Sequence, residues 1–221
     1  MTYRQMEKEF EQTASFIDAV KKRNLRVVTD DKQFFLNEAQ NSFIHTRINN
    51  VRKKIGNRQR ELDEIRTLIV KSKSLVATTL TSLYNEYDLP SDYHYLIADR
   101  TATTYCSITR EYQNRLMESE NITEALHGTH TKPKYNSPIS ELYGNTLRVY
   151  RDYNLTFTIN DVNIDYVRDW AEIDLFNGVD CELDDSVHKD IVQLAVNIFL
   201  EAVESGRFKT NIEKNTITEQ I

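Results

Sequence analysis

Apolar and polar residues alternate with a period of two along residues 154–166, which is the clearest pattern in the chain. Such alternation is typical of β-strands with one buried face. It stops at Asn160-Asp161 and then resumes, and both residue types accept the backbone angles of a two-residue turn. We therefore predict a hairpin over residues 153–168, in which Phe157 faces Ile164 and all apolar side chains share one side of the sheet.

A long helix with two apolar stripes is predicted to follow. Acidic residues at 184 and 185 suit a helix start, because the amino end of a helix favours negative charge. We expect the first stripe to pack on the hairpin's sheet. The second stripe is an interface candidate, although a cover from within the subunit, such as the helix over residues 2–23, is equally compatible. The first stripe contains Val187, Ile191, Leu194, Ala195, Ile198 and Ala202, and the second contains Val192, Val196, Phe199 and Val203.

The first third of the chain has the helical spacing of three and four. We predict helices over residues 2–23, 29–48 and 58–70, the second of which starts at Thr29 with Asp30 and Asp31 in its first turn. Strand composition appears over residues 74–84 and 95–106, and a short helix ends at Gly128.

Residues 205–221 are polar with widely spaced apolar side chains, which indicates an extended arm lying on a neighbouring subunit. These side chains are interface candidates: Phe208, Ile212, Ile217 and Ile221.

Together these elements predict an α+β fold with N-terminal helices, an antiparallel β-meander and a long C-terminal helix on the sheet. We expect a single domain over residues 1–204, with a helical part to residue 72 and a mixed part from residue 73, followed by the arm.

Bulk composition is that of an ordinary globular protein of 221 residues, 28% charged and 39% hydrophobic. The net charge of −6 is distributed unevenly. Residues 1–73 carry 16 basic and 10 acidic side chains, whereas residues 74–221 carry 12 basic and 24 acidic ones. This polarity suits a protein whose two ends meet different partners, and chance is the alternative. No apolar run has the length of a membrane span, so we expect no membrane association.

Candidate chemistry is sparse. The acids around the start of the last helix (Glu182, Asp184, Asp185 and Asp190) lie near His188 but match no standard metal spacing, and the helix dipole explains them. The chain has no nucleotide-binding or hydrolase motif. We therefore expect no catalytic residues, no metal and no cofactor, while a small hydrolase using these acids remains a third class of function.

A basic cluster lies over residues 52–60 and could contact nucleic-acid phosphate, although it has no interleaved aromatic residues. A DNA-binding protein is thus the alternative function. The candidate phosphate contacts are Arg52, Lys53, Lys54, Arg58 and Arg60.

Trp170 is an interface candidate at the end of the hairpin. In the predicted register Tyr153 faces Arg168, which would allow a cation–π pair there.

Short blocks of the sequence resemble the head–tail connector proteins of crAss-like and related Bacteroidetes phages. The blocks lie between about residues 25 and 205, and those near the end are the more specific. The chain departs from the family where Asp169-Trp170 replaces a frequent Lys-Pro, and where Asp184-Asp185 replaces a proline before the helix. The blocks are residues 29–32, 35–40, 61–69, 87–93, 166–168, 178–183, 188–192 and 195–196.

The resemblance implies a virion structural protein without catalytic residues. It would form a homo-oligomeric ring of twelve copies in the neck of the virion, between the portal protein and adjacent neck or tail rings, and would be made in the bacterial host cytoplasm. Genomic DNA would pass through the ring without specific binding. An acidic lining suits such a passage, because it does not hold phosphate.

Overall fold

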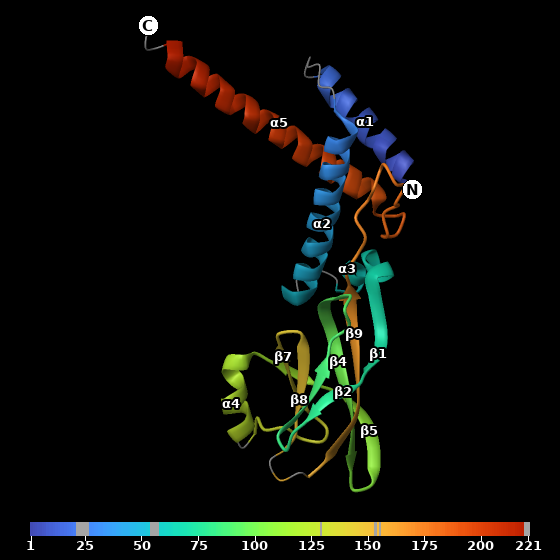
Figure 1. Cartoon of the computed structure of the whole chain (residues 1–221), viewed down its shortest axis with the longest axis vertical. Helices are drawn as coiled ribbons and strands as arrows, with labels where there is room; N and C mark the ends of the chain where they lie inside the picture. The colour runs from blue at the N-terminus through green and yellow to red at the C-terminus, as the bar shows by residue number, and fades with distance from the viewer. Residues whose placement is uncertain (21–26, 54–57, 129, 153, 155, 219–221) are drawn as a thin grey trace. The chain divides into compact units, whose positions relative to one another are not determined.

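The computed structural model describes residues 1–221 apart from 21–26, 54–57, 129, 153, 155 and 219–221, and it describes no side chains at 18–20, 52–58 and 204–221. The fold is α+β, as predicted (Figure 1). Two compact units make up the chain, one formed by residues 1–68 and 170–221 and the other by residues 69–169. The expected boundary near residue 72 is close to the observed one, but the chain after residue 169 returns to the first unit.

The first unit is helical. It contains α1 (Tyr3–Val20), α2 (Thr29–Lys53), α3 (Arg58–Glu64), the short 3-10 helix η1 (Arg66–Leu68) and α5 (His188–Thr218). The helix α2 begins at the predicted Thr29, with Asp30 and Asp31 in its first turn. Figure 1 shows α1 and α2 beside the first half of α5, and both helices contact it.

The second stripe of α5 is covered from within the unit. Phe199 lies between two rings, with centroid distances of 5.9 Å to Phe10 on α1 and 5.4 Å to Phe35 on α2. Val192 and Val196 are buried as well, and Val203 is half-buried. The expectation that this stripe forms an exposed interface is therefore wrong, and the alternative of a cover by the first helix is correct.

A segment of turns and irregular structure, residues 170–187, leads into α5 and is held by amide side chains of α2. Asn37 donates from Nδ2 to the carbonyl oxygen of Ile173 (3.0 Å) and accepts from its backbone N–H (2.7 Å). One turn later, Gln40 donates to the carbonyl oxygen of Ala171 (2.9 Å). Positions three apart share one face of a helix, so the polar face of α2 pairs backbone groups that would otherwise be buried without partners.

The second unit consists of two sheets and one helix. The first sheet has the strand order β1-β9-β4-β5 and the second has the order β2-β3-β8-β7-β6, with every pair antiparallel except β6–β7. The elements are β1 (Ile69–Leu75), β2 (Ala77–Leu80), β3 (Tyr84–Asp88), β4 (Tyr93–Tyr105), β5 (Ile108–Gln113), β6 (Arg115–Met117), α4 (Ser119–His127), β7 (Ile139–Tyr143), β8 (Thr146–Tyr150) and β9 (Thr158–Arg168).

The predicted hairpin over residues 153–168 is not formed. Instead β9 continues through Asn160-Asp161 and pairs with β1 on one side and β4 on the other. Against β4, Val162 is opposite Thr101 and Ile159 is opposite Thr103, so two residues of β9 face a single residue of β4. This β-bulge shifts the alternation by one position, and the sequence pattern was misread as a turn.

Apolar side chains of both sheets face each other and form the core of this unit. Phe157, Val162, Ile164 and Tyr166 are buried there, opposite residues of β3 and β8. The alternation along residues 154–166 was thus correctly read as one buried face, although the partner strands are different. The cover of that face comes from the second sheet.

Hairpin turns do occur elsewhere in the unit. The β4–β5 turn contains Cys106 and Ser107, both with positive φ, and the β7–β8 turn contains Gly144 with φ +59°. Cys106 is exposed.

The helix α5 extends to Thr218, so residues 205–218 are helical and not an extended arm. The side chains of Phe208, Ile212, Ile217 and Ile221 lie outside the described residues, and their role as interface contacts remains a prediction.

Candidate functional site

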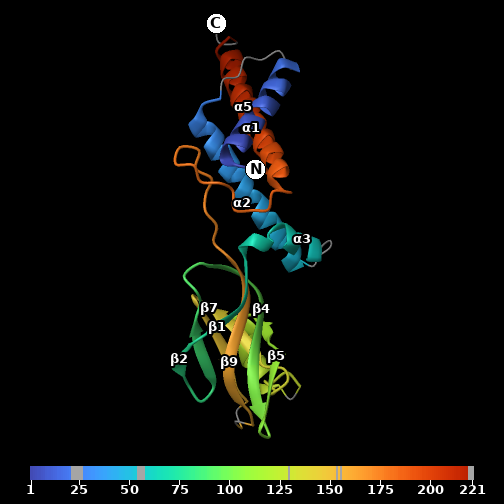
Figure 2. The same ribbon diagram turned by 90° about the vertical axis from the view of Figure 1, so that its right-hand side faces the viewer.

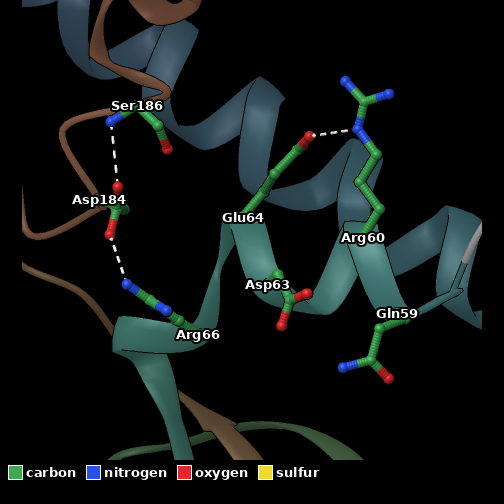
Figure 3. Close-up of a pocket in the computed structure, with 7 residues that line it drawn as sticks. All are labelled: Gln59, Arg60, Asp63, Glu64, Arg66, Asp184 and Ser186. Carbon is green, nitrogen blue, oxygen red and sulfur yellow. Dashed lines mark hydrogen bonds and ion pairs between the residues drawn. The ribbon is translucent and has the colours of Figure 1, made fainter.

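The acidic turn before α5 lines a shallow polar depression of about 330 Å³ in the helical unit. Figure 3 shows the side chains that surround it, from α3, η1 and the segment before α5. The Arg66 guanidinium reaches across to Asp184, with 3.0 Å between Nη2 and Oδ2. Asp184 also accepts from the backbone N–H of Ser186 through Oδ1 (3.1 Å).

These contacts determine the ionisation of the Asp184 carboxyl group. The N–H and side chain of Ser186, followed by Arg66, lower the pKa of Asp184, so this carboxyl stays ionised. On the α3 side, Glu64 pairs with Arg60 (3.1 Å) and with Arg47 of α2 (2.6 Å). The Arg66–Asp184 ion pair therefore joins η1 to the segment before α5, and the Arg47–Glu64 pair joins α3 to α2.

The remaining acids of the cluster also have partners. Asp185 pairs with the Met1 amino group and lies 3.3 Å from Nδ1 of the buried His188, whose Nε2 is 2.9 Å from the carbonyl oxygen of Leu183. Glu182 accepts from the backbone N–H of Ala171 (3.2 Å). Among the described residues, no group of three or more histidine, cysteine or acidic side chains could hold a metal ion.

Trp170 is anchored within the helical unit. Its indole Nε1 donates to Asn41 Oδ1 (2.9 Å), and its ring meets that of His45 edge-on at 5.7 Å. The Trp170 ring is half-buried because it contacts α2, which covers part of this interface candidate. The predicted contact between Arg168 and Tyr153 lies outside the described residues.

Only one side chain of the predicted basic cluster is described. Arg60 is exposed and pairs with Glu64, while the side chains of Arg52, Lys53, Lys54 and Arg58 lie outside the described residues. The cluster therefore remains an untested prediction.

The described helices contain no segment long and apolar enough to cross a membrane.

A second surface, which the sequence analysis did not identify, lies at the edge of the strand unit. The chain turns from β1 into β2 at Val76, whose side chain is 83% exposed, and Leu80 at the end of β2 is 68% exposed. In the described part of the chain β2 pairs only with β3. Residues 75–83 form a strand-prone run without any charged residue, and that is the signal that could have revealed the edge.

Neither a protein-family model nor a curated protein sequence matches this chain.

Proposed function

We propose that the chain is a virion structural protein that forms a closed ring, a head–tail connector between the portal and the tail of a phage. The resemblance of its short sequence blocks suggests this class. The exposed, uncharged edge of β2 is the single observation that carries the proposal.

Strand edges attract other strands. The outer side of an edge strand presents unpaired N–H and C=O groups, and proteins usually protect such edges with charges, prolines or a covering element. The neighbouring strand β1 has exposed lysines at 71 and 73, but β2 has no charged residue and exposes Leu80. An edge of this kind supports pairing with a strand of another copy, in which backbone hydrogen bonds supply affinity.

The other sheet offers a different edge, because its strand order ends at β5. Figure 2 shows β2 and β5 at opposite margins of the strand unit, and β5 pairs only with β4 among the described strands. Joining one edge to the other in the next copy is a heterologous contact, which produces a ring when the rotation closes. We propose that the β2 edge of one copy meets the β5–β6 side of its neighbour.

The charge distribution is compatible with a DNA passage. Residues 74–221, which include most of the strand unit and the C-terminal part of the helical unit, have twice as many acidic as basic side chains, and an acidic lining repels phosphate. In this proposal the partners are further copies of the chain, the portal protein and adjacent rings, with DNA in the channel.

The test is a double substitution on the proposed edge. Val76→Lys with Leu80→Lys adds two charges where both side chains are exposed, so the subunit should fold with an unchanged circular dichroism spectrum. The control is Phe16→Lys on α1, because this side chain is 71% exposed but lies on no sheet edge.

We expect native mass spectrometry to show rings for the wild type and the control, and monomers for the double variant. Rings of the double variant with wild-type mass and stability would overturn the proposed edge contact.

A further inference from the structure

The end of the β4–β5 hairpin carries a tyrosine-lined hollow of about 230 Å³ in the strand unit. One wall comes from the hairpin itself and the other from Tyr135 in the loop before β7. The hollow is separate from the β2 edge. Its lining residues are Thr103, Tyr105, Cys106, Ile108, Arg110, Tyr112 and Tyr135.

The register of the hairpin explains why these side chains meet. Tyr105 pairs with Ile108, Thr103 with Arg110 and Thr101 with Tyr112, so all six lie on the same face of the two strands. Thr101 and Thr103 are buried, which identifies this face as the one directed towards the core. Near the β4–β5 turn, Tyr135 of the loop before β7 covers this face.

The aromatic rings form an ordered group. Thr103 donates from Oγ1 to the carbonyl oxygen of Tyr135 (2.7 Å) and anchors the loop. The rings of Tyr105 and Tyr135 are stacked, with centroids 4.5 Å apart and planes 7° from parallel. Tyr112 meets Tyr135 edge-on at 6.1 Å. The two stacked rings remain 41% and 37% exposed, so flat aromatic surface is available to a ligand.

The charge at the hollow is positive. Among the described residues, the side chains of Arg110 and of the exposed Lys134 make neither a hydrogen bond nor an ion pair, although the backbone of Lys134 pairs with Ser137. The nearest acid along β5, Glu111, lies on the opposite face, where it accepts from Asn163 Nδ2 (3.1 Å) and lies 3.7 Å from Arg100. An unpaired guanidinium beside exposed aromatic rings matches a ligand that carries both flat rings and negative charge.

We propose that this hollow binds single-stranded nucleic acid, with a base stacked on the tyrosine pair and a backbone phosphate on Arg110. Stacking on aromatic side chains combined with a cationic backbone contact is the general mode of sequence-independent single-strand binding. A duplex keeps its bases stacked on one another, so a single strand is the form that offers a free base to these rings. This inference does not depend on ring formation.

The test measures binding of a fluorescein-labelled oligothymidylate of fifteen nucleotides to the full chain by fluorescence anisotropy, over a series of salt concentrations. We expect Tyr135→Ala to weaken binding roughly ten-fold or more, because one stacking surface is lost, and Tyr135→Phe to preserve it. Arg110→Ala should weaken binding and reduce the slope of log K against log salt by about one.

Two controls separate this site from other sources of binding. Tyr143→Ala removes an exposed tyrosine of β7 outside the hollow, and Arg60→Ala removes an exposed arginine of the predicted basic cluster. Both should bind the oligonucleotide like the wild type, and circular dichroism should show that every variant is folded.

Absence of binding by the wild type would overturn the proposal. So would binding that survives Arg110→Ala and Tyr135→Ala but is lost in Arg60→Ala, since the basic cluster would then be the site. If the hollow variants bind the oligonucleotide normally but lose contact with another copy of the chain, the hollow is a protein-docking surface and the proposal is also wrong.

Discussion

The apolar helix α5 of the helical unit and the β2 edge of the strand unit differ in how far their apolar side chains are covered. In the helical unit, the stripes of α5 that had seemed too wide for one subunit are covered by α1 and α2, with Phe199 between two rings. In the strand unit, the core is complete, yet Val76, Leu80 and the tyrosine-lined hollow remain exposed. A surplus of apolar positions on one helix therefore indicated the subunit's own core, whereas an uncharged strand edge indicates a surface open to partners.

The comparison is most strongly tested by Val196→Glu in α5. Val196 is fully buried, so a charge there should cost more than about 4 kcal/mol and yield an unfolded or aggregated subunit. Asn197→Glu, at the exposed neighbouring position, should change the free energy of unfolding by less than about 0.5 kcal/mol. A soluble, folded Val196→Glu protein that no longer assembles would restore the interface interpretation of this stripe.

Phe157→Ala probes the other core. Phe157 is buried between the two sheets, and its truncation should cost about 3–5 kcal/mol in urea denaturation. Thr156→Ala loses one hydrogen bond to Asp152 and should cost about 1 kcal/mol.

The single tryptophan makes the two units distinguishable in this experiment, because Trp170 contacts α2 in the helical unit. Phe157→Ala should shift the transition followed by tyrosine fluorescence, because every tyrosine except Tyr3 lies in the strand unit, and should leave the Trp170 emission transition in place. Equal shifts of both signals would mean that the two units unfold together, which would contradict their treatment as separate units.

A tyrosine of the strand unit gives a smaller, pH-dependent effect. Burial, and then the hydrogen bond from Tyr166 Oη to Asp92 Oδ1 (2.9 Å), raise the pKa of Tyr166 to about 12. A pKa above the unfolded value of about 10 stabilises the fold at lower pH, and this stability is lost as the pH rises from about 10 towards 12.

Tyr166→Phe should therefore cost about 1–2 kcal/mol at neutral pH, since Asp92 loses its donor, and should flatten the alkaline loss of stability. The alkaline loss should not vanish, because burial also raises the pKa of Tyr93 to about 12. Thermal melts between pH 8 and 12 measure both effects, and an unchanged alkaline slope in the variant would contradict the assignment.

The smallest effect is expected at the polar depression of the helical unit. Arg66→Ala removes an ion pair that is largely exposed, so the loss of thermal stability should be smaller than for Val196→Glu, Phe157→Ala or Tyr166→Phe. The pKa of Asp184 is lower in the folded than in the unfolded chain, so the ionised carboxyl stabilises the fold at pH values above the ordinary carboxyl pKa. This stabilisation is lost as the pH falls through the lowered pKa. Wild type and variant should therefore melt alike in strong acid or high salt. A large loss of thermal stability in Arg66→Ala at neutral pH would contradict this expectation.

Local signals predicted the helices well. The start of α2 at Thr29 and the end of α4 before Gly128 were both predicted from local signals, although Gly128 has φ −73° and does not adopt the left-handed conformation with which glycine commonly ends a helix. The third helix was predicted too long, because the chain leaves α3 for η1 and then enters β1 at Ile69. The hairpin failed because Asn160-Asp161 is equally suited to a turn and to a bulge, and only the partner strand decides between them.

The candidate sites were harder to predict because they are assembled from distant segments. The acidic cluster was attributed to the dipole of the last helix, but α5 begins only at His188, and the partner of Asp184 is Arg66, 118 residues away. The amide side chains of α2 that hold the segment after Trp170 carry no recognisable motif. The tyrosine-lined hollow depends on the register of β4 and β5 and on a loop 30 residues after Tyr105, so sequence spacing could not reveal it.

The most direct test of the central claim is the mass of the purified full-length chain in solution, measured by native mass spectrometry over a wide range of concentrations. A closed ring predicts one discrete oligomer, with twelve copies as the number implied by the resemblance, in equilibrium with subunits of 25.9 kDa and without larger species. A chain that remains monomeric at every concentration, or that forms a continuous series of sizes, would contradict the account.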